Sequence, residues 1–186
     1  MAPPTSVALA LRVALAQTGN AAALDSLLRD HQRSLYRHAM TILRDEDLAL
    51  DVLQVSLLLI ARKLGSLRDP RWFRAWSYRI TTRECLRAAR RQGREQLFLD
   101  QDLCVEAVET AAPEPASTDE LRQICTRGID QLPAASQLVV RLHYLEDLTL
   151  AEIAEALELP LGTVKSRLAY GLTRLRNLLS HNGALE

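Results

Sequence analysis

Apolar residues recur along the first half of the chain at intervals of three and four, the spacing that places side chains on one face of an α-helix. The pattern predicts helices over residues 7–17, 24–43, 45–64 and 71–91. Gly19 is placed to end the first helix, and Asn20 is placed to cap the second. A loop over 65–70 separates the last two. Helices of these lengths are sufficient to enclose one hydrophobic core.

The second half of the chain starts with a different composition. Residues 96–117 are acidic and include a Pro- and Ala-rich run at 111–116, which is typical of a flexible linker. Capping boxes at 117–120 and 149–152 then mark new helix starts. The pattern predicts helices over residues 133–144, 149–157 and 161–179. The last two are joined by a three-residue turn, and burying both apolar stripes requires a steep crossing, as in a helix-turn-helix.

The composition favours an all-α protein with two small helical domains. Only 4% of the 186 residues are aromatic, and there are seven Gly and seven Pro, too few turn and strand formers for a sandwich or barrel. The predicted domains cover 1–95 and 118–186, with the acidic linker over 96–117. The 48% of apolar residues can form a core.

Cysteine usage and hydropathy limit the other classes. Cys85, Cys104 and Cys125 are scattered and form no CxxC pair, which favours reduced thiols in a cytoplasmic protein over a disulfide framework or a metal site. No apolar run is long enough for membrane insertion. The four histidines pair with no nucleophile or carboxylate motif, and no Gly-rich phosphate loop is present. We therefore expect no enzyme activity and no cofactor.

The formal net charge of zero conceals a strong asymmetry. Residues 60–95 hold eleven basic and three acidic side chains, whereas residues 96–120 hold seven acidic and no basic ones. Five arginines are spaced four, four, three and four residues apart, so they share one face of a helix: Arg79, Arg83, Arg87, Arg90 and Arg94. Such a row suits the phosphates of a nucleic acid, and the alternative is a merely solvated charged face. Trp72 and Trp76 could stack on unpaired bases or belong to the core.

The predicted outward face of the last helix also suits DNA. It presents Thr163, Ser166, Arg167, Tyr170 and Arg174, with Lys165 beside them. Short polar side chains and Arg near a helix N-terminus are suited to base edges and phosphates in a major groove. A helix-turn-helix that serves only as a scaffold would carry the same pattern.

Several short strings resemble a known family. Leu-Pro at 132–133, the segments 148–154 and 160–168, and Leu-Arg at 175–176 closely resemble the promoter-reading domain of bacterial RNA polymerase sigma factors, in the extracytoplasmic-function (ECF) group. The likeness continues more loosely at 35–37, 51–54 and 73–80. It implies that the N-terminal domain binds the polymerase clamp helices and the minus-ten element, that the C-terminal domain reads the minus-thirty-five element, and that the linker runs towards the active site.

The resemblance assigns roles to individual residues. Contacts to the minus-thirty-five element are expected from Thr163, Lys165, Ser166, Arg167, Tyr170 and Arg174. Contacts to the minus-ten element are expected from Arg68, Arg71, Trp72, Trp76, Arg79, Arg83, Arg87, Arg90 and Arg91. The loop 65–71 is where a flipped promoter base would be held, and polymerase binding is expected at Asp51, Gln54 and Val55. The implied partners are core RNA polymerase, promoter DNA and either an anti-sigma protein or a Ser/Thr kinase.

The chain departs from the family in its polymerase-binding helix. Leu48, Leu50 and Val55 stand where acidic residues are common, which removes up to three negative charges. A phosphate on Ser56 or Thr41 would restore about two, which is the hypothesis of a phosphorylation switch. In addition, Arg83 replaces a frequent Asn and Tyr170 a frequent Arg, so we expect a different promoter preference.

Two other functions fit the same pattern. The first is a helix-turn-helix regulator that binds duplex DNA without polymerase, usually as a dimer on a palindromic site. The second is a sigma-like adaptor that binds only proteins.

Overall fold

The structure, a computed structural model, describes residues 7–92 and 126–181. Every regular element in these two ranges is a helix, which confirms the all-α prediction. The elements are α1 (Val7–Gln17), α2 (Ala21–Leu43), α3 (Glu46–Lys63), the 3-10 turns η1 (Leu64–Ser66) and η2 (Pro70–Trp72), α4 (Phe73–Arg91), α6 (Ala134–Tyr144), α7 (Leu150–Leu157) and α8 (Leu161–His181). The acidic linker predicted over 96–117 and the capping box at 117–120 lie outside the described residues.

Local side-chain hydrogen bonds set the starts of three helices. The Asn20 side chain accepts a hydrogen bond from the first turn of α2, and Asp45 does the same for α3. Thr149 and Glu152 form the predicted capping box of α7, in which the Thr149 N–H donates to Glu152 Oε2 at 2.8 Å. These bonds satisfy backbone donors that have no partner within the helix.

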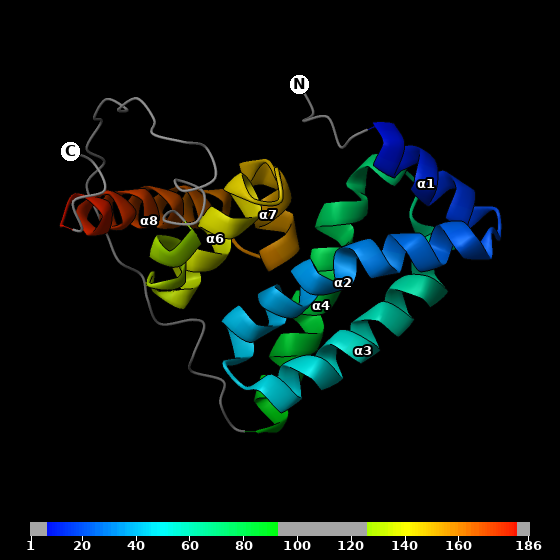
Figure 1. Cartoon of the computed structure of the whole chain (residues 1–186), viewed down its shortest axis with the longest axis horizontal. Helices are drawn as coiled ribbons and strands as arrows, with labels where there is room; N and C mark the ends of the chain where they lie inside the picture. The colour runs from blue at the N-terminus through cyan, green and yellow to red at the C-terminus, as the bar shows by residue number, and fades with distance from the viewer. Residues whose placement is uncertain (1–6, 93–125, 182–186) are drawn as a thin grey trace.

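Helices α1 to α4 form the N-terminal unit of the molecule (Figure 1). Helices α2, α3 and α4 pack against one another, and α1 packs on α2 and on the 3-10 turns. Leu27, Ile60, Phe73 and Tyr78 are fully or almost fully buried at its centre. The face of α4 that carries these aromatic residues therefore points into the core, which leaves its arginines at the edges.

Helices α6, α7 and α8 form the C-terminal unit. Gly171 allows α8 to approach α6 closely, because a Cβ at this position would lie 2.7 Å from Val140 Cγ2. Glu158 ends α7 in the left-handed conformation, with φ of 56°, and the chain then turns directly into α8. The α7–turn–α8 arrangement is the predicted helix-turn-helix.

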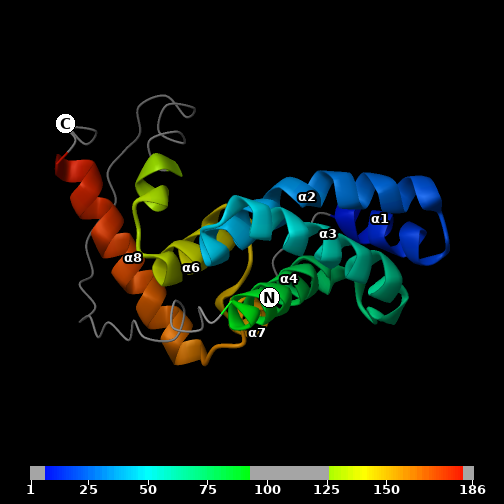
Figure 2. The ribbon, with the colours of Figure 1, turned by 90° about the horizontal axis from the view of Figure 1, so that it is seen from below.

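The two units share one continuous hydrophobic core, with α7 against α4 and α6 against α2 (Figures 1 and 2). In α7, Ile153, Ala156 and Leu157 are buried, and Leu150 and Ala154 are half-buried. These apolar side chains allow α7 to pack against both α8 and α4. The sequence suggested two domains separated by a linker, and nothing in its periodicity predicted that they would pack together.

Candidate nucleic-acid interface

The second helix of the helix-turn-helix presents most of its predicted DNA-facing residues. Lys165, Ser166 and Arg174 are exposed, while Thr163 and Tyr170 are half-buried. Ser166 Oγ donates a hydrogen bond to the Thr163 carbonyl at 3.0 Å, within the first turn of α8. This turn therefore offers a cation and small polar groups in the geometry that suits a DNA groove.

Arg167 differs from the prediction, because its side chain is only 9% exposed. It follows the buried Val164 by three residues and precedes the buried Gly171 by four, so it belongs to the buried side of α8. The prediction that Arg167 faces outward is therefore wrong for this conformation.

Two arginines of α4 contact acidic residues in and directly after α7. Arg79 Nη1 donates to Glu155 Oε1 at 2.8 Å, and Arg79 Nε lies 3.4 Å from Glu158 Oε1. Arg83 Nη2 lies 2.5 Å from the same Glu158 oxygen. The hydrogen bond from Arg83 lowers the pKa of Glu158, so this carboxylate is charged at neutral pH. These two arginines thus have partners other than solvent.

The following arginines lie farther along α4. Arg87 Nη1 pairs with Glu84 Oε1 at 2.5 Å on the same helix. Arg90 and Arg91 are exposed, and Arg94 lies outside the described residues. This end of α4 therefore keeps its positive charge at the surface.

The loop before α4 is held by a residue that the sequence analysis missed. Gln17 Nε2, at the end of α1, donates to the carbonyls of Leu64 and Leu67 at 3.0 and 2.7 Å. Asp69 caps η2 and accepts hydrogen bonds from Arg71 Nε and Nη2, and these bonds lower the pKa of Asp69. No sequence motif identifies Gln17, since it acts across about fifty residues.

The two tryptophans have different environments. Trp76 is half-buried and packs on the core, with its ring centroid 6.2 Å from that of Phe73. Trp72 is 43% exposed at the end of η2, and Arg68 in the same loop is also exposed. Of the two aromatic rings, Trp72 is therefore the one that a nucleic-acid base could reach.

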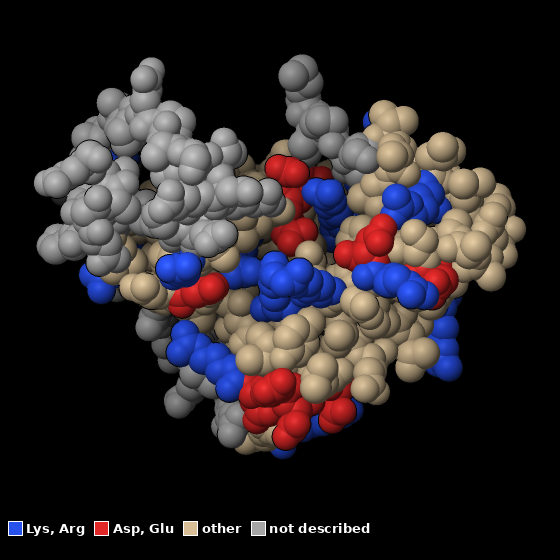
Figure 3. Space-filling view, viewed as in Figure 1, with Lys and Arg blue, Asp and Glu red and all other residues tan. Residues whose placement is uncertain are grey.

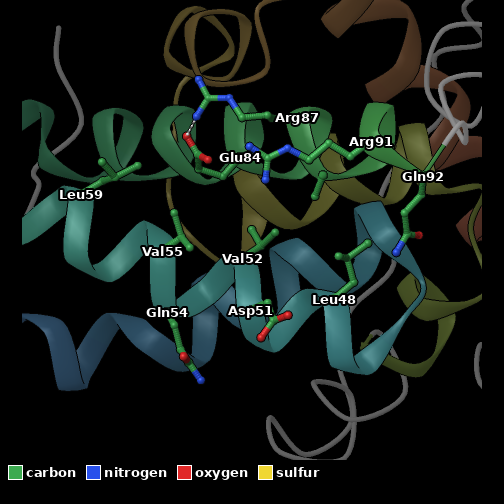
Figure 4. Close-up of a pocket in the computed structure, with 11 residues that line it drawn as sticks. Leu48, Asp51, Val52, Gln54, Val55, Leu59, Glu84, Arg87, Arg91 and Gln92 are labelled. Atoms are coloured by element: carbon green, nitrogen blue, oxygen red, sulfur yellow. Dashed lines mark hydrogen bonds and ion pairs between the residues drawn. The ribbon is translucent and has the colours of Figure 1, made fainter.

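A groove of about 660 Å³ runs between α3 and α4 (Figure 4). Its floor is apolar, because Leu48, Val52, Val55 and Leu59 of α3 point towards α4. Asp51 and Gln54 point away from α4 on the outer side of α3, where both are exposed. Val55 is exposed as well. The residues predicted to bind polymerase thus lie together on α3.

Acidic side chains gather where α3 begins. Glu46 and Asp47 are exposed there, one turn before Asp51, and Figure 3 shows acidic side chains over the start of α3. Basic side chains cluster on the same face over the second half of α2 (Figure 3). The missing acids at positions 48, 50 and 55 are therefore partly offset by charges earlier in the helix.

The two residues of the phosphorylation hypothesis are buried. Ser56 is 0% exposed, and its hydroxyl has no hydrogen-bond partner among the described residues. Thr41 is also buried and donates to the Arg37 carbonyl at 2.8 Å. A kinase could not reach either hydroxyl in this conformation.

His38 is a buried side chain of the N-terminal unit that the proposed sites do not include. His38 is buried against Thr82, with 2.9 Å between its Nε2 and the Thr82 hydroxyl, and burial lowers its pKa to about 3. Within residues 7–92 and 126–181, no three His, Cys, Asp or Glu side chains are placed to hold a metal ion. In the same ranges no helix has the length and hydropathy needed to cross a membrane.

Comparisons with known proteins agree with this geometry. Residues 27–95 match Sigma-70 region 2, and residues 128–177 match Sigma-70, region 4. The ECF RNA polymerase sigma factor SigM of Mycobacterium tuberculosis is 31% identical over 163 residues, which cover 88% of this chain and 80% of SigM. The RNA polymerase sigma factor SigV of Bacillus subtilis is 28% identical over 155 residues, which cover 83% of this chain and 90% of SigV.

Two solved structures have a similar fold. CnrH, in complex with the cytosolic domain of CnrY, is 24% identical with a TM-score of 0.59, and the match covers 94% of this chain and 98% of CnrH. The sigma factor RpoE of Bartonella quintana, in complex with the anti-sigma factor NepR, is 24% identical with a TM-score of 0.56, and the match covers 84% and 96% of the two chains.

The matches to Sigma-70 regions 2 and 4, together with the helix-turn-helix, make this a DNA-binding transcription protein. The chain belongs to the ECF group of the sigma-70 family of RNA polymerase sigma factors. Sigma factors are not themselves enzymes, and they act in transcription initiation.

Proposed function

We propose that this chain directs core RNA polymerase to a specific set of promoters. In this role α3 binds the clamp helices, α4 and the loop before it hold the minus-ten element, and α8 reads the minus-thirty-five element. The observation that carries the proposal is the exposed cation and small polar groups at the start of α8, in a chain that also holds a basic α4. Polymerase acts in the cytoplasm, so the proposed role places the chain there.

Each proposed contact rests on a chemical match. On α8, Lys165 and Arg174 can contact phosphates or guanine, and Ser166 can contact base edges. Exposed Trp72 offers a ring on which an unpaired base can stack. On α3, Asp51 follows the exposed acids at the start of the helix, and such a surface is complementary to a basic clamp.

Control by an anti-sigma protein is supported by the likeness to RpoE of Bartonella quintana, which was solved with its anti-sigma factor. Activation by phosphorylation has less support. Because Ser56 and Thr41 are both buried, α2 or α3 would first have to expose them.

Run-off transcription with core polymerase and a randomised promoter library tests the proposal. We expect RNA that starts at a defined distance from one recurrent sequence. A regulator that works without polymerase would only block transcription by another sigma factor, and an adaptor would do neither. Either result would contradict the proposal.

Substitutions then test the assignment to α8. Arg174→Ala should weaken binding to the selected promoter by about 1–3 kcal/mol if Arg174 makes a bidentate base contact, and should reduce initiation there accordingly. Arg29→Ala, which removes an exposed and ion-paired arginine of α2, serves as the control and should leave initiation unchanged. Equal initiation by both variants would remove Arg174 from the interface.

A further inference from the structure

One side chain of α1 holds the loop between α3 and α4 at two points of its backbone. Gln17 Nε2 donates to the carbonyl oxygens of Leu64 and Leu67 at 3.0 and 2.7 Å, and both leucines are buried. A primary amide nitrogen carries two N–H donors, so this loop takes both donors of Gln17. The two residues between the leucines are exposed, and so is Arg68 directly after them. The amide therefore ties the buried part of an otherwise exposed loop to α1.

The Leu67 carbonyl is the part of the loop that depends most on this amide. Leu67 follows η1 in an extended conformation, with φ of −73° and ψ of 106°, so its carbonyl points out of the 3-10 turn. The residue is only 9% exposed. A buried carbonyl that loses its hydrogen-bond partner is costly. Without the Gln17 amide, we expect the loop to move until this carbonyl reaches water.

Arg68 lies between two fixed points of the loop backbone. On one side, the Leu67 carbonyl is held by Gln17. On the other side, the Asp69 carboxylate caps η2 by accepting a hydrogen bond from the backbone N–H two residues later. The backbone from which the exposed Arg68 side chain extends is therefore held on both sides, and one of the two holds comes from α1.

We propose that Gln17 is a positioning residue for promoter recognition, which holds the loop so that Arg68 meets one unpaired base of the minus-ten element in a fixed geometry. This inference rests on the proposed function, because it takes the loop to contact promoter DNA, and it assigns part of base selection to a residue outside the loop. An arginine side chain carries only donors, so the base that Arg68 selects must present acceptors, as guanine does with O6 and N7. A guanidinium that is free to move would contact any base or phosphate, so the selectivity depends on the hold.

Two substitutions remove the hold by different chemistry, and both are tested in the full chain with core polymerase and the randomised promoter library. Gln17→Met keeps a similar length without N–H donors, and Gln17→Glu places a carboxylate opposite the two carbonyl oxygens. For Gln17→Met we expect the preference for the best base over the worst at one minus-ten position to fall about three- to tenfold, because two hydrogen bonds that hold the loop are lost. Gln17→Glu should lose at least as much. Base preferences at the minus-thirty-five element, which α8 reads, should stay as in the wild type.

The matched control removes a side-chain hydrogen bond from the same end of α1 that stays within this helix. Thr18 Oγ1 donates to the Leu15 carbonyl at 2.8 Å. Thr18→Val removes this bond, and we expect it to keep the wild-type base preference at every promoter position. If Thr18→Val changes the preference as Gln17→Met does, the effect belongs to the end of α1 in general and the role of the Gln17 amide is refuted.

A double-mutant cycle separates positioning from a purely structural role. Positioning predicts that Arg68→Ala loses the same base preference and that Gln17→Met, added to Arg68→Ala, lowers it no further. A loss of stability alone would reduce the total amount of RNA and leave the base preference unchanged. If the two substitutions lower the preference additively, Gln17 does not act through Arg68 and the proposal is overturned.

Amide hydrogen exchange measures the hold on the loop without DNA or polymerase. The Leu67 N–H donates to the Leu64 carbonyl at 3.1 Å, and the same carbonyl accepts from Gln17. In Gln17→Met this N–H should exchange about three- to tenfold faster, because the local opening of the loop becomes easier. An exchange rate equal to that of the wild type would show that the amide does not hold the loop, which also overturns the proposal.

The two proposals fail in different ways. If the wild-type chain starts no RNA with core polymerase, the proposed function is wrong, and the role of Gln17 in promoter recognition is wrong with it. If the wild-type chain initiates at a recurrent sequence but Gln17→Met keeps the same base preference at every position, the proposed function stands and only the inference about Gln17 is overturned.

Discussion

Replacing Glu158 by glycine separates the two roles that this residue combines. Glu158→Gly keeps the left-handed turn between α7 and α8 but removes the carboxylate that meets Arg79 and Arg83. We expect the variant to weaken the contact between α7 and α4 while the C-terminal unit stays folded. A residue with a purely structural role would change stability alone.

The magnitudes follow from the local geometry. A non-glycine residue in the left-handed conformation costs roughly 1–2 kcal/mol, which the glycine recovers. Against this, glycine makes the unfolded chain more flexible, at a cost of about 0.5–1 kcal/mol. Loss of partly exposed ion pairs removes about 0.2–1 kcal/mol more. We therefore expect the free energy of unfolding to change by less than about 1 kcal/mol.

Loss of the ion pairs should shift the equilibrium towards separation of α7 from α4 by about two- to fivefold, while the apolar contact between the two units remains. Urea denaturation measures the first quantity, and small-angle scattering with single-stranded DNA binding measures the second. Arg44→Gly is the control, since Arg44 ends α2 with φ of 52° and lines a pocket with residues 130–137, none of which belongs to α7. If Glu158→Gly and Arg44→Gly give the same dimension and DNA affinity, the reasoning is refuted.

Three further predictions concern packing and protonation. Gly171→Ala should destabilise the chain by about 1–3 kcal/mol, because its Cβ would lie 2.7 Å from Val140 Cγ2, whereas Gly162→Ala has free space and should be neutral or stabilising; equal urea midpoints would contradict this. Ser56→Ala should stabilise the chain by about 1 kcal/mol in the same assay, because it removes a buried hydroxyl without a partner among the described residues; a loss would show that the hydroxyl is bonded. The free energy of unfolding should fall by up to about 1.4 kcal/mol per pH unit from pH 6.5 towards pH 3, because the unfolded chain binds the proton that buried His38 excludes. His38→Gln should remove that part of the pH dependence.

The helix boundaries were predictable because their signals are local. Asn20, Asp45 and the Thr149–Glu152 pair each bond to backbone atoms within one turn, so a short window of sequence contains both partners. The same holds for the turn after Glu158, which Pro160 marks. Helical spacing then placed the apolar stripe of each helix in the core.

The contacts that join distant segments were not predictable in this way. Arg79 and Glu155 are 76 residues apart, and Gln17 and Leu64 are 47 apart, so no local pattern relates them. Arg167 shows a further limit. It lies at the border of the apolar stripe of α8, where a helical projection from spacing alone does not decide between the buried and exposed sides.

The ion pairs set part of the energy that nucleic-acid binding at α4 would have to overcome. In the role proposed above, Arg79 and Arg83 would exchange Glu155 and Glu158 for phosphates, and the two carboxylates would return to water. These side chains are already partly exposed, so the exchange itself requires little additional desolvation. Separating α7 from α4 would in addition expose the apolar residues of the core that the two units share. A partner that binds only the separated form needs a differential affinity of about 5.5 kcal/mol to move the two forms from 1:99 to 99:1.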